Sequence, residues 1–168
     1  SNWEWRSIGL IVHMAYEWAQ RVGDMRLLTW NNLDLKAQRL DLEQSKRRAD
    51  VHLPISDTLC SMLVQQETDF GFQPYVAPRP EPYNGVYTSY HSTDIHRLVN
   101  EVKEEAKLSK DLTALDLRRT GITEMVEAGV DTLGIMQVSG HSNPQSVKPY
   151  LVNTLKGASN ALNKRSNN

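Results

Sequence analysis

Residues 115–150 read LDLRRTGITEMVEAGVDTLGIMQVSGHSNPQSVKPY. Helical spacing places Arg118 on one row with Ile122 and Val126, whereas Arg119 lies on a polar row. A half-buried guanidinium is costly unless an anion or a carboxylate satisfies it. We therefore expect Arg118 to point inward and Arg119 to be a solvated surface charge.

Three short helices are predicted along this stretch. Asp116 can cap the first, and Gly129 and Gly140 mark the two ends of the second. Asn143-Pro144 is a cap and first-turn signal for the third. We therefore expect three short helices along this stretch.

These helices would bring together Arg118, His141 and Tyr150. His141 directly follows a helix-ending glycine, and Tyr150 lies near the end of the third helix. An arginine and a histidine can hold an anionic group while a phenol attacks it. The tyrosines at 75, 83, 87 and 90 are rival nucleophiles, but none of them follows a Gly-His pair at this spacing.

The same residues resemble the tyrosine recombinases, or phage integrases. The matching segments are DLRRTG at 116–121, EAGVD at 127–131, and Gly140-His141 followed at the family's spacing by Tyr150. Upstream, the family's first arginine segment is similar to RVGDMRLLTW at 21–30, and its lysine hairpin to EQSK at 43–46. The resemblance extends from about Ile8 to Leu151, and the five motifs stand in the family's order.

This resemblance implies a reaction on double-stranded DNA at attachment or crossover sites. Arg21, Arg118 and His141 would hold the scissile phosphate, Tyr150 would attack it, and Lys46 would protonate the 5′ oxygen. The covalent 3′-phosphotyrosine conserves the energy of the broken bond, so no ATP, metal or other cofactor is expected. The family works as a homo-oligomer, and we expect a tetramer on DNA.

Supporting residues are predicted around this set. Asp24 either pairs with Arg21 or caps the helix that follows it. Arg47, Arg48 and Arg119 are candidate contacts to the DNA backbone, with solvated surface charge as the alternative. The family often has a glycine soon after its lysine, and this chain has none.

One position departs from the family. The residue three before the second arginine is usually histidine, and here it is Leu115, which can neither accept a proton nor bind a phosphate. The alternative is therefore a degenerate recombinase-like module that binds DNA without cleaving it. A helix-turn-helix regulator over 123–138 would leave Arg21, Lys46 and Tyr150 unexplained. Topoisomerase-like relaxation of supercoils would use the same site.

Hydrophobic periodicity predicts an α+β fold that is mainly helical, with a small three-stranded antiparallel sheet beside the site. The expected helices cover 3–20, 24–28, 57–67 (capped by Ser56) and 92–107, and the expected strands 33–35, 40–43 and 51–55. Segment 70–90 is rich in proline and is predicted to be a loop with one short strand at 75–77. A weak helical pattern covers 155–162.

The 168 residues fit a single catalytic domain, with 151–168 as a C-terminal tail and without the family's N-terminal core-binding domain. No apolar run is long enough to span a membrane, and no signal peptide is evident. The single cysteine, Cys60, indicates a reducing setting, and we expect a cytoplasmic location at the nucleoid, in the host if phage-encoded. The net charge of -1 requires basic residues to cluster on one face, or further parts to supply DNA affinity.

Overall fold

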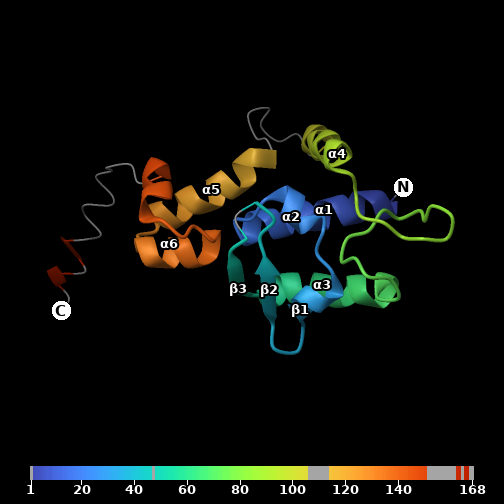
Figure 1. The fold of residues 1–168 in the computed structure, drawn as a ribbon, viewed down its shortest axis with the longest axis horizontal. Coiled ribbons are helices and arrows are strands. Elements are labelled where there is room, and N and C mark those ends of the chain that lie inside the picture. Colours follow the sequence, from blue (N-terminus) through green and yellow to red (C-terminus); the bar gives the residue numbers. More distant parts are fainter. Residues whose placement is uncertain (1, 47, 106–113, 151–161, 164, 167–168) are drawn as a thin grey trace.

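The computed structural model describes residues 2–46, 48–105, 114–150, 162–163 and 165–166. It is mainly helical with one three-stranded antiparallel sheet, which confirms the predicted α+β class (Figure 1). The elements are α1 (Asn2–Glu17), α2 (Val22–Met25), η1 (Trp30–Asn32), β1 (Leu33–Asp34), β2 (Arg39–Glu43), β3 (Asp50–Pro54), α3 (Asp57–Phe70), α4 (Ser92–Glu105), α5 (Ala114–Glu127), α6 (Thr132–Ser139), η2 (Pro144–Ser146) and η3 (Lys148–Tyr150).

Helix α1 supplies the central surface on which α2, α4 and α5 pack. Its apolar side chains Ile8, Ile11 and Met14 are fully buried, as their helical spacing predicts. The helix ends at Glu17, not at residue 20 as predicted. Ala19 has a φ of 51°, so the chain turns there in the left-handed region.

The short helix α2 differs from its prediction in position. It begins at Val22 rather than Asp24, and residues 18–21 separate it from α1. Asp24 is buried inside the helix and is not its N-cap, a place that Arg21 takes. Leu27, two residues after the end of the helix, is 41% exposed.

The sheet follows the predicted alternation. Strand β2 pairs with β1 on one side and β3 on the other, with Leu40 opposite Leu53 and Leu42 opposite Val51. These four side chains are buried, while the residues between them are partly or fully exposed. Because side chains alternate across a strand, this register gives the sheet one apolar face.

Helix α3 begins where the sequence predicts. The Ser56 hydroxyl caps it by accepting a hydrogen bond from the Leu59 amide, at 3.2 Å. The helix continues to Phe70, about one turn beyond the predicted end. The loop that follows contains no strand at 75–77. That prediction is reduced to a single bridge between Tyr75 and Thr29.

The C-terminal helices are bounded largely as predicted. Helix α5 already includes Asp116, which therefore cannot be its N-cap. Asp131 caps α6 by accepting from the Gly134 amide, and Gly140 ends that helix with a φ of 77°. The predicted end of the helix at 92–107 and most of the predicted helix at 155–162 lie outside the described residues.

Two groups of buried apolar side chains hold these elements together. The larger surrounds α1 and reaches the sheet, α3 and α4. The smaller consists of Ala19, Ile122, Ile135 and Val147, which join the turn after α1 to α5, α6 and the end of η2. Helices α5 and α6 thus form one end of the molecule (Figure 1). In the described part of the chain, no helix is both long and apolar enough to cross a membrane.

Candidate active site

The two consecutive arginines of α5 face different surroundings. Arg118 is 9% exposed, and its Nη2 donates to the Ser139 carbonyl at 2.7 Å. Arg119 is exposed. The predicted helical rows, one inward and one outward, are therefore confirmed.

His141 is buried beside this arginine, with 5% of its surface exposed. The left-handed conformation of Gly140 turns the chain at the end of α6 and directs it into His141. Nδ1 of the imidazole lies 2.6 Å from the hydroxyl oxygen of Ser139. Ser139 therefore contacts Arg118 through its carbonyl and His141 through its hydroxyl.

Arg21 stands at the start of α2 in an extended conformation and is partly buried. The residue before it, Gln20, is fully buried and donates from Nε2 to the Val138 carbonyl at 2.7 Å. This bond joins the Arg21 segment to the last turn of α6. The first predicted arginine is thus attached to the same helix end as Arg118 and His141.

The hairpin that carries Lys46 is attached to the same place. Lys46 is exposed in the turn after β2. Two residues earlier, Gln44 donates from Nε2 to the Ser139 carbonyl at 2.9 Å. The next residue, Ser45, donates from its hydroxyl to Asp24 Oδ1 at 2.5 Å. Asp24 therefore holds the lysine hairpin beside α2, a role that neither predicted alternative included.

Two of the three candidate DNA-backbone contacts, Arg48 and Arg119, lie in the described part of the chain. Arg48 is exposed in the turn and has a φ of 49°. Arg119 is exposed on α5. Arg47 lies outside the described residues.

The described main chain of Tyr150 forms the end of η3, a 3₁₀ turn that contacts α5. The Asn143 carboxamide caps η2 by accepting from the Gln145 amide at 2.9 Å, as the Asn-Pro signal predicts. The buried Val147 anchors this segment to the smaller core. The side chains of Tyr150 and Leu115 lie outside the described residues.

The rival tyrosines belong to other surroundings. Tyr90 is 2% exposed within the main core. Tyr87 packs edge-on against Phe72, with the ring centroids 5.2 Å apart. Tyr83 is 77% exposed. Tyr75, in the loop after α3, forms a β-bridge with Thr29, which precedes η1.

Together these contacts place the segments that carry Arg21, Lys46, Arg118 and His141 around the C-terminal end of α6. Guanidinium groups bind phosphate oxygens through paired N–H donors and remain charged at any working pH. A lysine on an exposed turn and a buried imidazole add a proton donor and a further hydrogen-bond donor. The chemistry that suits such a set is the binding and transfer of a phosphate group.

The sequence interpretation missed Gln20, Gln44 and Ser139. Each precedes a predicted site residue by one or two positions, which is the only local signal that they carry. Their hydrogen bonds join residues far apart in the chain, so no local pattern reveals them.

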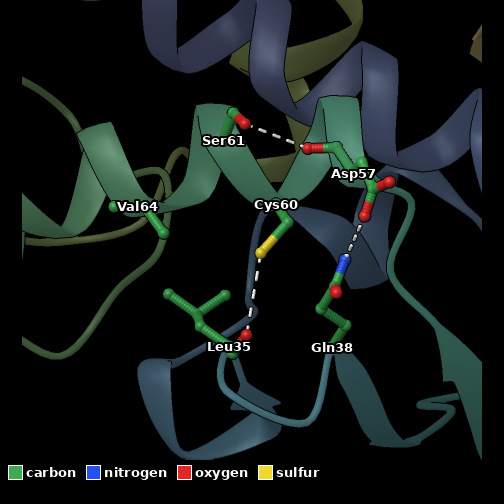
Figure 2. Close-up of a pocket in the computed structure, with 6 residues that line it drawn as sticks. All are labelled: Leu35, Gln38, Asp57, Cys60, Ser61 and Val64. Carbon is green, nitrogen blue, oxygen red and sulfur yellow. Dashed lines mark hydrogen bonds between the residues drawn. The ribbon is translucent and has the colours of Figure 1, made fainter.

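A hollow lies apart from these residues, between α3 and the turn joining β1 to β2 (Figure 2). It has a volume of about 510 Å³ and is lined by Leu35, Gln38, Asp57, Cys60, Ser61 and Val64. Gln38 donates to Asp57 at 2.9 Å, and the Cys60 thiol faces the Leu35 carbonyl at 3.7 Å. The hollow contains none of the predicted site residues, and Cys60 is a half-buried wall residue rather than a core one.

The sequence matches the model of the phage integrase family over residues 6–156. The chain belongs to this family. No curated protein matches it closely enough to count as a relative. Family membership agrees with the order of the arginine, lysine, histidine and tyrosine motifs along the chain.

Solved structures with a similar fold are tyrosine recombinases. XerA recombinase matches with a TM-score of 0.70 and 16% identity, over 98% of this chain and 62% of that one. A lambda integrase dimer bound to a COC' core site gives 0.66 and 18%, over 87% and 42%. The Tn1549 transposon integrase in complex with a circular intermediate DNA gives 0.69 and 15%, over 92% and 57%. At these identities the similarity shows the fold, and the phage integrase chain described here spans only part of each relative.

Proposed function

We propose that this chain is the catalytic domain of a site-specific recombinase that cleaves and rejoins DNA through a covalent 3′-phosphotyrosine. The observation that carries the proposal is the double contact of Ser139 with Arg118 and His141. A buried guanidinium and a buried imidazole that share one partner form a preorganised pair of donors for a phosphate. Membership of the phage integrase family supports the same reading.

The substrate that we propose is double-stranded DNA at attachment or crossover sites. Lambda integrase has been solved as a dimer on a core site and as a tetramer bound to a Holliday junction. By analogy with that relative, a tetramer on DNA is the assembly that we propose here. Strand exchange needs two duplexes, and a tetramer supplies one active site for each of the four strands.

In the proposed reaction, the phenolic oxygen of Tyr150 attacks the scissile phosphorus. A bond forms between that oxygen and phosphorus, and the bond from phosphorus to the 5′ oxygen breaks. Lys46 gives its proton to the departing 5′ oxygen, and the phenol gives its own proton to water as it attacks. In the rejoining step, the 5′ hydroxyl of a second strand attacks the phosphotyrosine and gives its proton to Lys46. The bond between phosphorus and the tyrosine oxygen then breaks, and that oxygen takes up a proton from water.

Arg21, Arg118 and His141 hold the non-bridging oxygens of the phosphate in this reaction. Negative charge on these oxygens must be stabilised while both bonds are partly formed. Donors that are already in place provide that stabilisation without reorganising, which is why such groups contribute strongly to rate. Arg21 and Arg118 also stabilise the negative charge that develops on the Tyr150 oxygen as it loses its proton.

The test is a nicked duplex that carries the correct core site and traps the covalent adduct. Wild-type protein should form an adduct that survives denaturing electrophoresis. Tyr150→Phe should form none while binding the same DNA within a few-fold of wild type, because only the nucleophilic oxygen is lost. The matched control is Tyr83→Phe, at an exposed loop tyrosine, which should form adduct normally. Adduct in Tyr150→Phe would show that another tyrosine is the nucleophile.

The second candidate function is DNA binding without cleavage. It is favoured by Leu115, which stands where the family usually has a histidine. Under this alternative, wild-type protein binds the core site, but neither it nor any variant at 115 forms adduct.

A further inference from the structure

Gln44 closes the turn that carries Lys46. Its main-chain amide donates to the Ala49 carbonyl at 2.9 Å, and its main-chain carbonyl accepts from the Arg48 amide at 2.8 Å. Both main-chain polar groups of Gln44 thus pair with residues on the other side of the turn and close it. The residue is only 1% exposed, unlike its neighbours Ser45 and Lys46.

The side chain of Gln44 reaches away from the hairpin into the helices. Nε2 donates to Gln20 Oε1 at 2.6 Å and to the Ser139 carbonyl at 2.9 Å. Gln20 in turn donates from its own Nε2 to the carbonyls of Trp18 and Val138, at 2.9 and 2.7 Å. Both buried amides therefore use both of their N–H donors.

Main-chain carbonyls fix the orientation of these two amides. Gln20 faces two carbonyls with one terminal atom, and that atom must be its nitrogen, since a carbonyl cannot donate. Its oxygen is then left to face Gln44, whose nitrogen must point toward both Gln20 and the Ser139 carbonyl. The uncharged side-chain amide of Gln44 provides both of these donors.

The partners of Gln44 lie next to the residues proposed to hold the phosphate. Gln20 directly precedes Arg21 in the chain. The Ser139 carbonyl accepts from Arg118 as well as from Gln44, and its hydroxyl contacts His141. The side-chain amide of Gln44 therefore hydrogen-bonds to Gln20, the neighbour of Arg21, and to Ser139, which contacts both Arg118 and His141.

Gly140 makes room for this arrangement. A Cβ built at Gly140 would collide with the carboxamide of Gln44. Its φ of 77° also favours glycine. The tight approach of the hairpin to the end of α6 thus depends on a missing side chain at 140 and a buried amide at 44.

We propose that Gln44 is a positioning residue that docks the base of the lysine turn onto Ser139 and Gln20, so that Lys46 is held in register with the phosphate-binding groups. This inference rests on the proposed function, because it gives Lys46 a leaving oxygen to protonate. An exposed lysine on a two-stranded hairpin has many rotamers. Fixing the main chain two residues before it limits where the base of the turn can place the lysine.

The main variant is Gln44→Met, which keeps the length of the side chain and removes both donors. The matched control is Gln73→Met, because Gln73 is also buried and also donates from Nε2 to two main-chain carbonyls, those of Phe70 and Tyr75. Gln73 lies in the loop after α3, away from the lysine hairpin. Gln20→Met is a second test variant that removes one partner and leaves the Gln44 bond to Ser139 in place, in case Gln44→Met does not fold.

The first measurement is the single-turnover rate of adduct formation on the nicked duplex at saturating DNA. Gln44→Met should slow it by about 100-fold, on the scale of losing general acid catalysis, with DNA affinity within a few-fold of wild type. Gln20→Met should slow it in the same direction, and Gln73→Met should stay within about 3-fold of wild type. Equal rates for Gln44→Met and its control would overturn the inference.

The second measurement replaces the bridging 5′ oxygen of the scissile phosphate by sulfur. A thiolate leaves without a proton because its conjugate acid has a pKa of about 8.5, so the reaction no longer needs Lys46. Gln44→Met and the benchmark Lys46→Ala should then both react within about 5-fold of wild type. A Gln44→Met defect that sulfur does not relieve would show that the residue acts on general folding or on the arginines, and would overturn the proposal.

The two measurements also separate this inference from the function on which it rests. If wild-type protein forms no adduct with either substrate, the recombinase proposal fails and the role of Gln44 fails with it. If wild-type protein forms adduct and the Gln44 variants behave like Gln73→Met, only the role of Gln44 is lost.

Discussion

Gly121 of α5 packs directly against Ala19, the residue that turns the chain after α1. A Cβ at Gly121 would lie 2.8 Å from the Cβ of Ala19 and 3.3 Å from its Cα. Ala19 has no flexible side chain that could move aside, so only glycine permits this approach. The contact fixes the distance between the segment that leads into Arg21 and the helix that carries Arg118.

Gly121→Ala should therefore lower the free energy of unfolding by about 1–3 kcal/mol, the usual cost of overpacking a core. The matched control is Gly9→Ala within α1, where an added Cβ meets nothing within 4 Å. That control should raise stability by about 0.5–1 kcal/mol, because alanine is the better helix former. Urea unfolding of the three proteins gives both values. Stabilisation by both substitutions would contradict the packing described at Gly121.

The same contact shows which parts of the fold the sequence could predict. Helix α6 was predictable because Gly140 marks its end locally, and the sheet because apolar residues alternate along β2 and β3. The end of α1 was not, since the apolar pattern runs on to Ala19. The turn at Ala19 packs against Gly121, about a hundred residues later in the chain, and helix propensity is easily overridden by such tertiary contacts.

The candidate site divides in the same way. Helical rows separate Arg118 from Arg119, and motif order along the chain singles out Arg21, Lys46, His141 and Tyr150. The glutamines that join these segments could not be found, because Gln44 bonds to a carbonyl 95 positions away. Glutamine is more often exposed than buried, so the residue type gives no signal of these buried contacts.

Arg118 is buried and Arg119 is exposed, and this difference predicts very different losses of activity when each is replaced. Arg118→Ala should reduce the single-turnover cleavage rate by at least about 100-fold, the scale of removing one preorganised donor to an oxyanion. Arg21→Ala should cost a similar factor. Arg119→Ala, at an exposed position, should cost far less and should act mainly on DNA affinity.

A control for folding is built into this comparison. In Arg118→Ala the Ser139 carbonyl keeps its hydrogen bond from Gln44, so that carbonyl is not left without a donor. The variant should therefore melt close to wild type, as measured by circular dichroism. Equal rate losses at 118 and 119 would refute the distinction between an inward and an outward arginine.

A further prediction concerns alkaline pH and the link between α1 and α5. The Tyr16 hydroxyl donates to both carboxylate oxygens of Glu124, at 3.1 and 3.0 Å. This hydrogen bond, with smaller contributions from partial burial and the charge of Glu124, raises the pKa of Tyr16 above its ordinary value of 10.0. The neutral phenol is thus favoured in the folded protein. Its stabilisation is fully present below pH 10.0 and is lost as the pH rises through the folded-state pKa.

The measurement is the difference in melting temperature between wild type and Tyr16→Phe across this range. The difference should be constant at neutral pH and should shrink above about pH 10. Glu124→Gln keeps an acceptor but removes the charge, so it should bring the pKa of Tyr16, followed by ultraviolet absorbance, back toward its ordinary value. A difference that grows with pH would mean that the link favours the phenolate.

The last prediction concerns Leu115, which decides between an enzyme and a DNA-binding module. If the domain cleaves DNA, the missing histidine must be tolerable, because Arg21, Arg118, His141 and Lys46 still supply charge stabilisation and a proton. A general acid–base group typically contributes about 100- to 10,000-fold, so a site lacking one can remain a slow recombinase. Leu115→His, which installs the residue usual in the family, should then raise the rate of adduct formation.

Stability must be followed in the same experiment, because replacing a leucine that anchors a core costs about 2 kcal/mol or more. Leu115→Ala is the matched control: it removes the same apolar surface without adding an imidazole. A gain in rate for Leu115→His that Leu115→Ala lacks, at similar melting temperatures, assigns the gain to the imidazole itself. A chain under no demand for cleavage has no reason to retain two arginines, a lysine, a histidine and a tyrosine in the family's order, which is why we expect slow cleavage rather than none. If neither the wild-type protein nor Leu115→His forms adduct on its correct core site while both bind it, the enzyme reading fails and the binding module replaces it.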